Sequence, residues 1–168
     1  MDYIEFYNKY RDKIFSYFYY NLRSDRELAE DLTSDTFLKW FEKIDTYDDN
    51  YSFSTWIFTI ARNKLIYHYR KEKKDISIDN EDSQEIEEFT KYETDFNSKI
   101  DVEFKMEEVY VALEKIPSTQ KELIIMRYLN EFSTKEISQI SWKKEANIRK
   151  IISRGLQKVS NILEPNLV

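Results

Sequence analysis

The sequence predicts an all-α protein of two small helical domains joined by an acidic, flexible linker. Three observations lead to this prediction. The 168 residues include one glycine and two prolines, whereas turn-rich all-β folds need many more of both. Apolar residues recur at spacings of three and four along most of the chain, which is the pattern of amphipathic helices. Acidic residues concentrate in one central stretch that lacks this pattern.

The composition excludes several classes of active site. Cysteine is absent and His68 is the single histidine, so disulfide frameworks, thiol catalysis and zinc sites of Cys/His type are excluded. Phosphate-binding loops need two glycines and dinucleotide fingerprints need three, but the chain has Gly155 alone. We expect no cofactor, no metal site and a reduced, cytoplasmic protein.

The sequence also lacks the patterns of export and membrane insertion. The first ten residues include Asp2 and Glu5 and have no long apolar run of the kind that signal peptides carry. No stretch approaches the roughly eighteen uncharged apolar residues of a bilayer-spanning helix. We therefore expect no membrane insertion.

The charge is distributed unevenly and divides the chain into three segments. Residues 1–74 hold 13 basic and 13 acidic side chains, and residues 100–168 hold 11 basic and 10 acidic ones. Residues 75–99 hold nine acidic and two basic side chains. Their balance of −7 is larger in magnitude than the net charge of −6 of the whole chain. This composition is typical of a linker without fixed structure, with a short acidic surface helix around 84–92 as the alternative.

The first domain, residues 1–74, is predicted to contain three helices. An apolar stripe places the first helix along Tyr3, Tyr7, Tyr10, Ile14 and Tyr17 or Phe18. The segment Ser24–Glu27 has the form of a capping box and predicts the start of a second helix. The apolar face of that helix includes Leu28, Leu32, Phe37, Trp40, Phe41 and Ile44. After a polar loop over 45–52, the third helix carries Phe53, Ile57, Ile60, Ala61 and Leu65.

The second domain, residues 100–168, is predicted to end in a helix-turn-helix. Its first stripe runs through Val102, Met106, Val109, Leu113 and Ile116 until Pro117 interrupts it. Two further capping boxes, Thr119–Glu122 and Ser133–Glu136, predict a helix through Leu129 and a short helix after it. The last helix carries Ile148, Ile151, Ile152, Leu156 and Val159. A short helix followed closely by a longer basic one is the sequence form of a helix-turn-helix.

Two basic clusters are candidates for nucleic-acid binding. In the last helices, cations and one amide that can reach phosphates and base edges are Lys143, Lys144, Asn147, Arg149, Lys150 and Arg154. In the third helix, basic residues alternate with aromatic ones, a combination that suits single-stranded or distorted nucleic acid. The structural alternative for the last helices is a solvated surface helix, and for the third helix it is a core role for Phe53, Trp56 and Phe58.

An enzymatic role is not favoured. His68 has no histidine or cysteine to join it. The many Asp and Glu residues could hold a magnesium ion, but Glu27, Glu30 and Asp31 have the pattern of acidic residues near the start of a helix, which complement its dipole without any metal. A metal-dependent nuclease is therefore the third function class, behind the two considered below.

The order of the motifs resembles that of bacterial sigma factors of the extracytoplasmic-function (ECF) group in the sigma-70 family. Residues 29–40, AEDLTSDTFLKW, are similar to one helix of these factors, and residues 53–63, FSTWIFTIARN, to a second motif. Residues 113–117, LEKIP, and residues 136–154 resemble the C-terminal helix-turn-helix domain of the same group. The resemblance covers both domains in order, with an acidic linker between them.

The resemblance implies a promoter-specificity subunit of RNA polymerase with no active site of its own. The 28–44 helix would dock on the clamp helices of the largest polymerase subunit through Asp31, Asp35, Phe37, Trp40 and Phe41. The loop and third helix would read and melt the minus-ten element through Asn50, Tyr51, Trp56, Arg62, Asn63, Lys64, Arg70, Lys73 and Lys74. The C-terminal domain would grip the flap of the second-largest subunit and read the minus-thirty-five element. An anti-sigma protein is a further partner that the family implies.

Several positions depart from the family pattern. A glycine, an apolar residue and a serine cap usually form the helix-turn-helix turn, but here Trp142, Lys143 and Lys144 stand there. Tryptophan lacks the access of glycine to positive φ and lysine is a poor N-cap, so Ser141 is expected to cap instead. Ile151 replaces a common arginine of the recognition helix, and Tyr67 stands where the family often has aspartate. These departures suggest weak upstream binding, with an additional DNA-targeting factor that helps deliver the polymerase.

The main alternative is a stand-alone helix-turn-helix transcription regulator, with the first domain as a ligand or dimer module. The helix over 29–41 distinguishes the two, because a regulator has no need for a polymerase-docking face.

Overall fold

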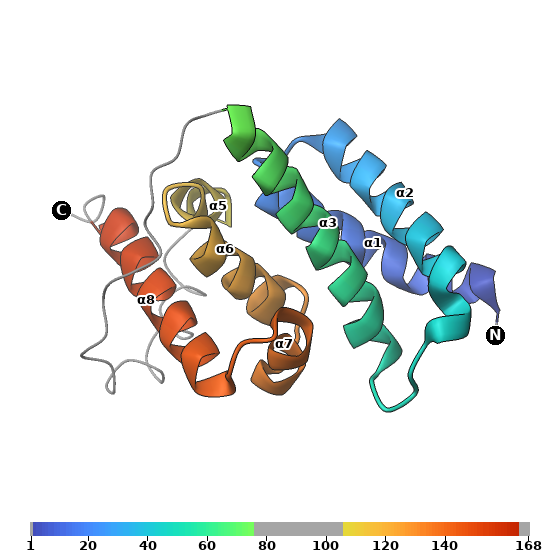
Figure 1. Cartoon of the computed structure of the whole chain (residues 1–168). Coiled ribbons are helices and arrows are strands. Elements are labelled where there is room, and N and C mark those ends of the chain that lie inside the picture. Colours follow the sequence, from blue (N-terminus) through green and yellow to red (C-terminus); the bar gives the residue numbers. More distant parts are fainter. Residues whose placement is uncertain (1, 76–105, 165–168) are drawn as a thin grey trace. The chain divides into compact units, whose positions relative to one another are not determined.

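The computed structural model describes residues 2–75 and 106–164, which form two helical units (Figure 1). All regular elements in these two ranges are helices, which confirms the predicted all-α fold. None of them combines the length and apolarity that crossing a bilayer requires. The predicted linker over 75–99 lies outside the described residues except for Asp75, and so does Val102 of the next predicted stripe.

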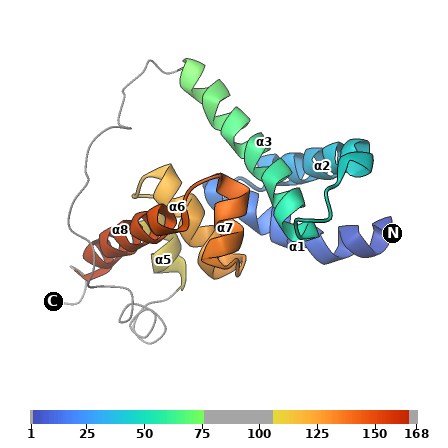
Figure 2. The same cartoon turned by 60° about the horizontal axis from the view of Figure 1, so that its bottom comes forward.

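The N-terminal unit consists of three long helices, α1 (Tyr3–Asn21), α2 (Arg26–Lys43) and α3 (Phe53–Asp75), with a short 3₁₀ turn, Ile44–Thr46, after α2. Each helix packs against the other two (Figures 1 and 2). The core between them is apolar and aromatic and includes Ile14, Tyr17, Phe18, Ala29, Phe37, Trp40, Ile57, Phe58, Ala61 and Leu65. Periodicity therefore located all three helices of this unit correctly.

Helix α2 begins one residue later than its predicted capping box. Asp25, not Ser24, is the N-cap, and its carboxylate accepts a 3.0 Å hydrogen bond from the backbone N–H of Leu28. Ser24 has a φ of 60° and Arg23 a φ of 54°, so both are left-handed, whereas an N-cap needs extended backbone. The left-handed pair turns the chain back from α1, and the N–H of Ser24 donates to the carbonyl of Tyr19 at 2.9 Å.

The buried face of α2 is also rotated from the predicted one. Leu28 and Leu32 are half-buried and Phe41 is exposed, whereas Ala29, Thr33 and Thr36 are buried. The hydroxyls of Thr33 and Thr36 donate to carbonyl oxygens four residues earlier in the helix, at 2.6 and 2.7 Å. Threonine can therefore occupy the interface because its polar atom is satisfied by its own helix.

The C-terminal unit contains α5 (Met106–Leu113), α6 (Ser118–Ile124), a π-helical turn η2 (Ile125–Leu129), α7 (Thr134–Ser141) and α8 (Glu145–Leu163). Helix α8 packs against α5 and α6. The core is formed by aliphatic side chains, among them Leu113, Leu123, Ile125, Met126, Ile137, Ile140, Ile148, Ile152 and Val159.

The two predicted capping boxes of this unit differ in outcome. Ser133 and Glu136 form a complete capping box at the start of α7, with distances of 3.1 and 2.8 Å, which confirms that prediction. The box over Thr119–Glu122 is absent, because α6 already begins at Ser118 with Pro117 as its N-cap and no side-chain cap. Proline suits this place, because its fixed φ matches the helix entry and it lacks the N–H that would need a partner.

Gly155 allows α8 to approach α6 closely. A Cβ placed on Gly155 would lie 2.7 Å from Cδ1 of Ile124 and 3.1 Å from Cβ of Gln120. Real Cβ atoms essentially never come within 3.0 Å of a heavy atom from another part of the chain. The only glycine of the chain is therefore used for helix packing and not for a turn.

Candidate nucleic-acid and protein interfaces

The outer α2 face, formed by Asp31, Asp35, Leu38 and Phe41, points away from the core of the N-terminal unit. These residues follow each other at spacings of three and four, so they lie along one side of the helix. Both carboxylates are exposed, and Leu38 and Phe41 are 64% and 59% exposed. The ring of Tyr3 contacts that of Phe41 edge to face at 5.5 Å. Leu38 is absent from the predicted docking residues, although its spacing from Asp31 and Asp35 could have indicated it.

Phe37 and Trp40, two of the predicted polymerase-docking residues, lie on the buried side of α2. They are 7% and 3% exposed. The Phe37 ring lies 4.8 Å from that of Tyr7, and the Trp40 ring lies 5.6 Å from that of Phe53. These two side chains therefore hold α2 against α1 and α3 and leave little surface for a partner.

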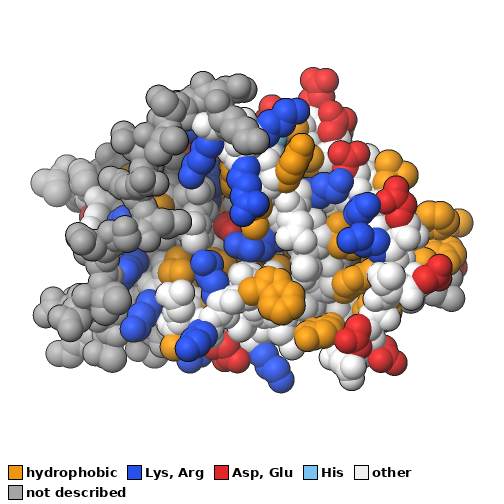
Figure 3. Space-filling model, in the orientation of Figure 1, with side chains coloured by type: hydrophobic (Ala, Val, Ile, Leu, Met, Phe, Trp, Pro, Cys, Tyr) orange, Lys and Arg blue, Asp and Glu red, His pale blue; other side chains and the backbone are white. Residues whose placement is uncertain are grey.

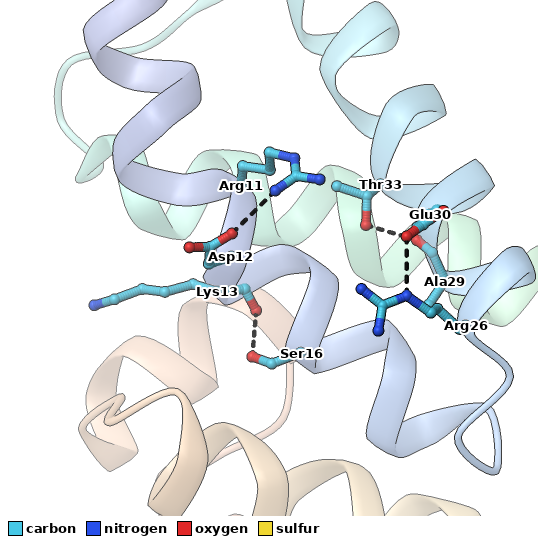
Figure 4. A network of polar contacts seen from close by, with 8 residues as sticks. All are labelled: Arg11, Asp12, Lys13, Ser16, Arg26, Ala29, Glu30 and Thr33. Carbon is cyan, nitrogen blue, oxygen red and sulfur yellow. Dashed lines mark hydrogen bonds and ion pairs between the residues drawn. The ribbon is translucent and has the colours of Figure 1, made fainter.

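The first turns of α2 hold one ion pair and one side-chain hydrogen bond to the backbone (Figure 4). Arg26 Nε lies 3.2 Å from Glu30 Oε1, and the Thr33 hydroxyl donates to the carbonyl of Ala29 in the same segment. Glu30 is thus paired with a cation. Within the two described ranges, no three acidic or histidine side chains gather as metal ligands would.

The loop over 47–52 is closed by its own hydrogen bonds. The Tyr47 hydroxyl donates to the backbone carbonyl of Tyr51 at 2.7 Å, and the Asn50 side-chain amide donates to the Asp48 carboxylate at 2.7 Å. The loop leaves Asn50 and Tyr51 exposed. Asn50 would have to leave Asp48 before its amide could bind a base.

Tyr47 connects this loop to the start of α3. Its ring lies 4.9 Å from that of Trp56. Burial raises the pKa of the Tyr47 hydroxyl, and the nearby negative charge of Asp49 adds to the effect. Ser52 accepts a hydrogen bond from the N–H of Thr55 at 3.2 Å and so fixes the helix start. The loop is therefore held by contacts at both of its ends, while Asn50 and Tyr51 remain exposed.

Helix α3 brings most of the predicted minus-ten residues to one side. Trp56, Asn63 and Arg70 are spaced by seven and form one line along the helix. Arg62 and Lys73, eleven apart, form an adjacent line. Asn63, Arg70 and Lys73 are exposed, whereas Trp56 and Arg62 are half-buried. Tyr67, absent from the predicted site residues, is 69% exposed between Asn63 and Arg70 and adds an aromatic surface.

Three other residues of α3, Lys64, His68 and Lys74, do not belong to these two lines. Lys64 lies near Glu42 of α2: a hydrogen bond from Lys39 holds the pKa of the Glu42 carboxyl below its usual range, and the charge of Lys64 adds to this. His68 Nε2 lies 3.1 Å from Glu72 Oε1 on its own helix. Lys74 belongs to α3, but its side chain is outside the described part.

The turn between α7 and α8 is made by Trp142, Lys143 and Lys144. Trp142 has φ 60° and ψ 18°, the left-handed conformation that glycine adopts more readily than tryptophan and that was not expected here. Its N–H donates to the carbonyl of Ser138 at 2.9 Å, and the Ser138 hydroxyl donates to the carbonyl of Lys143 at 2.6 Å. These two hydrogen bonds stabilise the left-handed turn.

The prediction that Ser141 caps the last helix was wrong. Ser141 is buried and ends α7, while Lys144 is the N-cap of α8 and gives no side-chain hydrogen bond. Because Trp142 reverses the chain, the helix starts in the register of the family pattern.

Helix α8 separates its apolar and basic residues. Ile148, Ile152, Gly155, Val159 and Leu163 form the buried line. Lys144, Asn147, Arg149 and Lys150 are exposed, whereas Lys143 and Arg154 are half-buried. Arg149 lies 3.7 Å from Glu145. Figure 3 shows lysine and arginine side chains over α8 on the face that it displays.

Comparisons with known proteins agree with this arrangement. Residues 6–75 match the family model described as Sigma-70 region 2, and residues 106–159 match the one described as Sigma-70, region 4. The chain is 30% identical over 156 residues to the ECF RNA polymerase sigma factor SigW of Bacillus subtilis (strain 168), covering 87% of this chain and 80% of that protein. The chain belongs to the ECF sigma factors.

A second sequence relative of this ECF sigma factor agrees with the assignment, and two solved structures share its fold. It is 28% identical over 156 residues to SigM of Bacillus subtilis (strain 168), covering 92% of this chain and 91% of that protein. Among solved structures, it resembles the sigma factor RpoE in complex with the anti-sigma factor NepR from Bartonella quintana. The TM-score is 0.73 at 22% identity, over 97% of both chains. CnrH in complex with the cytosolic domain of CnrY gives a TM-score of 0.68 at 16% identity, over 97% of this chain and 88% of that one.

As an ECF sigma factor, the protein binds core RNA polymerase and directs promoter recognition, DNA melting and transcription initiation. The stand-alone regulator is disfavoured, because the first helical unit matches region 2 and is not an unrelated ligand or dimer module.

Proposed function

We propose that the ECF sigma factor divides its work between its two units, with no active site of its own. The carrying observation is the contrast between two exposed surfaces of the N-terminal unit. The outer α2 face is acidic and apolar, which suits a protein partner, whereas the exposed side of α3 is basic and aromatic, which suits nucleic acid. The boundaries at 1–74, 75–99 and 100–168 belong to this proposal.

In this proposal, the outer α2 face docks on the clamp helices of the largest polymerase subunit. Asp31 and Asp35 supply charge, while Leu38 and Phe41 supply apolar area that a partner can bury. Phe37 and Trp40 act indirectly, because they hold the helix in place from below. The cytoplasm is the place of action, because the polymerase works there.

The loop over 47–52 and helix α3 would open the minus-ten element. Melting requires that a base leave the duplex, which costs a few kcal/mol. Stacking on exposed rings and contacts from cations offset that cost. The contacts are proposed to come from Asn50, Tyr51, Trp56, Arg62, Asn63, Lys64, Tyr67, Arg70, Lys73 and Lys74.

Helix α8 would lie in the major groove of the minus-thirty-five element, while the same unit grips the polymerase flap. Lys144, Asn147 and Lys150 are exposed near its start, where recognition helices contact base edges. Arg149 is paired with Glu145, which weakens its attraction to DNA phosphates. This pairing is consistent with the hypothesis that an additional DNA-targeting factor assists binding. Because two solved relatives are complexes with an anti-sigma factor and with the cytosolic domain of CnrY, an anti-sigma partner is also proposed.

Transcription by sigma-free core polymerase of the same organism, on fragmented genomic DNA, tests the proposal. With the full chain added, discrete new starts should share two upstream elements. Leu38→Asp should abolish these starts together with polymerase binding, whereas Asn63→Ala combined with Arg70→Ala should abolish starts but keep polymerase binding. Starts that share only the minus-ten element would support delivery by another factor. Absence of both starts and polymerase binding with the unchanged chain would contradict the proposal.

A further inference from the structure

Trp142 combines two features that are rare together in a bulky residue. It is 79% exposed, more than any other large hydrophobic side chain of the described residues. Its backbone is left-handed, with a φ of 60°. This conformation favours glycine and strains residues with a Cβ, and for a bulky side chain it is an outlier. Strained positions of this kind gather at functional sites.

The hydrogen bonds that stabilise this turn do not use the indole ring, so they do not explain why a tryptophan stands here. Hydrogen bonds from the Trp142 N–H to Ser138 and from the Ser138 hydroxyl to Lys143 involve no atom of the indole. Glycine could make the same turn without strain. Ile140 and Ile148, on the two sides of the turn, are fully buried, so the flanking helices are firmly held and the indole stays at the surface beside the start of α8.

The surroundings of the indole fit duplex DNA. Lys143 precedes the start of α8, and Lys144, Asn147 and Lys150 are exposed along its first turns. The nearest acidic residue in sequence, Glu145, is paired with Arg149. A flat apolar ring bordered by cations matches the groove edge, where thymine methyl groups are apolar and the flanking phosphates are anionic. An acidic protein surface would also attract these cations. It would not explain why the indole lies at the start of the recognition helix, where such helices contact base edges.

We propose that Trp142 is a specificity-determining residue whose indole packs against a thymine methyl group at the edge of the upstream promoter element. The proposal rests on the proposed DNA contact of α8. It gives the turn a role in reading sequence, in addition to that of orienting the helix.

The experiment uses the holoenzyme, made from core polymerase and the full chain, on the upstream element found in the transcription experiment. Binding is measured on duplexes in which each thymine is replaced singly by deoxyuridine, which lacks the 5-methyl group. With the unchanged chain, one replacement should weaken binding about fivefold. Trp142→Gly should weaken binding by about the same factor on the unmodified duplex and lose the sensitivity to that replacement, whereas Trp142→Phe should retain part of both.

Two controls separate the possible failures. Trp142→Gly should raise the thermal midpoint of the free chain, because glycine relieves the left-handed strain, so unfolding could not explain the lost binding. Lys144→Ala combined with Lys150→Ala tests the DNA contact of α8 itself. If that pair weakens binding and Trp142→Gly does not, only the role of Trp142 is overturned. If neither has an effect, the proposed function of α8 fails with it. Loss of polymerase binding in Trp142→Gly would overturn the proposal in favour of a protein contact.

Discussion

The hydroxyl of Tyr69 donates a 2.7 Å hydrogen bond to the backbone carbonyl oxygen of Asn21. The bond ties helix α3 to the last residue of α1, across a sequence separation of 48 positions. It therefore fixes the basic second half of α3 to the core of the N-terminal unit. Of the residues proposed to hold the melted strand, Arg70 and Lys73 lie next to this attachment.

Removing this hydrogen bond should destabilise the N-terminal unit. Tyr69→Phe is expected to lower the free energy of unfolding by about 1 kcal/mol, because it leaves a partly buried carbonyl without that donor. Two of the three tryptophans, Trp40 and Trp56, lie in this unit. Urea unfolding followed by tryptophan fluorescence in a Trp142→Phe background therefore reports on it alone. Tyr67→Phe, at an exposed neighbour, is the control, and an equal loss in both variants would contradict the prediction.

The contact of Gly155 with α6 should show as coupling between two substitutions. Gly155→Ala places a methyl group 2.7 Å from Cδ1 of Ile124, and Ile124→Val removes that Cδ1 atom. We expect Gly155→Ala to be more favourable in the Ile124→Val background than in the unchanged chain, by at least about 0.5 kcal/mol. Thermal unfolding of all four proteins measures the coupling. Additive effects would mean that the helices separate freely at this point.

Phe41 and Phe37 should separate polymerase binding from stability. Phe41→Ala, on the outer α2 face, should weaken binding to core polymerase and leave the unfolding free energy nearly unchanged. Phe37→Ala should instead lower the unfolding free energy by about 3 kcal/mol, because it leaves a cavity among packed rings. Binding to immobilised core polymerase and urea unfolding measure the two effects. If both variants are fully folded and lose the same polymerase affinity, the prediction is contradicted, because the buried and the exposed ring would then contribute equally to binding.

Glu145 should restrain the DNA affinity of α8. Glu145→Gln frees Arg149 and removes a negative charge from the recognition-helix start, so affinity for duplex DNA should rise roughly threefold at low salt. The gain should shrink as salt increases, because exposed charges are screened. Glu164→Gln, at the far end of α8, is the matched control. Fluorescence anisotropy with labelled duplex at several salt concentrations measures the effect, and unchanged affinity at low salt would refute it.

Tyr47 should contribute to the loss of stability at alkaline pH. Its pKa is raised in the folded protein above the ordinary value of 10.0, so the unfolded chain releases the proton first as pH rises. The stabilising contribution is therefore complete below pH 10 and declines through the folded pKa. Tyr47→Phe should flatten that part of the curve of unfolding free energy against pH. Unfolding measured between pH 8 and about 11 tests this, and parallel curves for both proteins would contradict it.

Periodicity and motif order predicted the helices and the family, while errors concentrate where backbone conformation decides. Serine is a favoured N-cap residue, but the left-handed φ of Ser24 prevents it from capping α2. Thr119 stands in a capping-box pattern, but proline had already started the helix. Trp142 adopts a conformation that residue preference argues against. For Ser24 and Trp142, the path of the chain between two packed helices outweighs a local preference of about 1 kcal/mol, whereas for Thr119 the preceding Pro117 decides where the helix begins.

The sequence by itself determined that the protein is helical, that its charge is segregated and that its motifs follow the order of ECF sigma factors. These properties depend on composition and spacing, which are local and can be read along the chain. Only the tertiary structure decided that Phe37 and Trp40 are buried while Leu38 and Phe41 are exposed, and that Trp142 projects from a left-handed turn. A spacing of three or four residues marks a helix side but not its neighbour, and burial is set by the neighbouring helices that pack against that side.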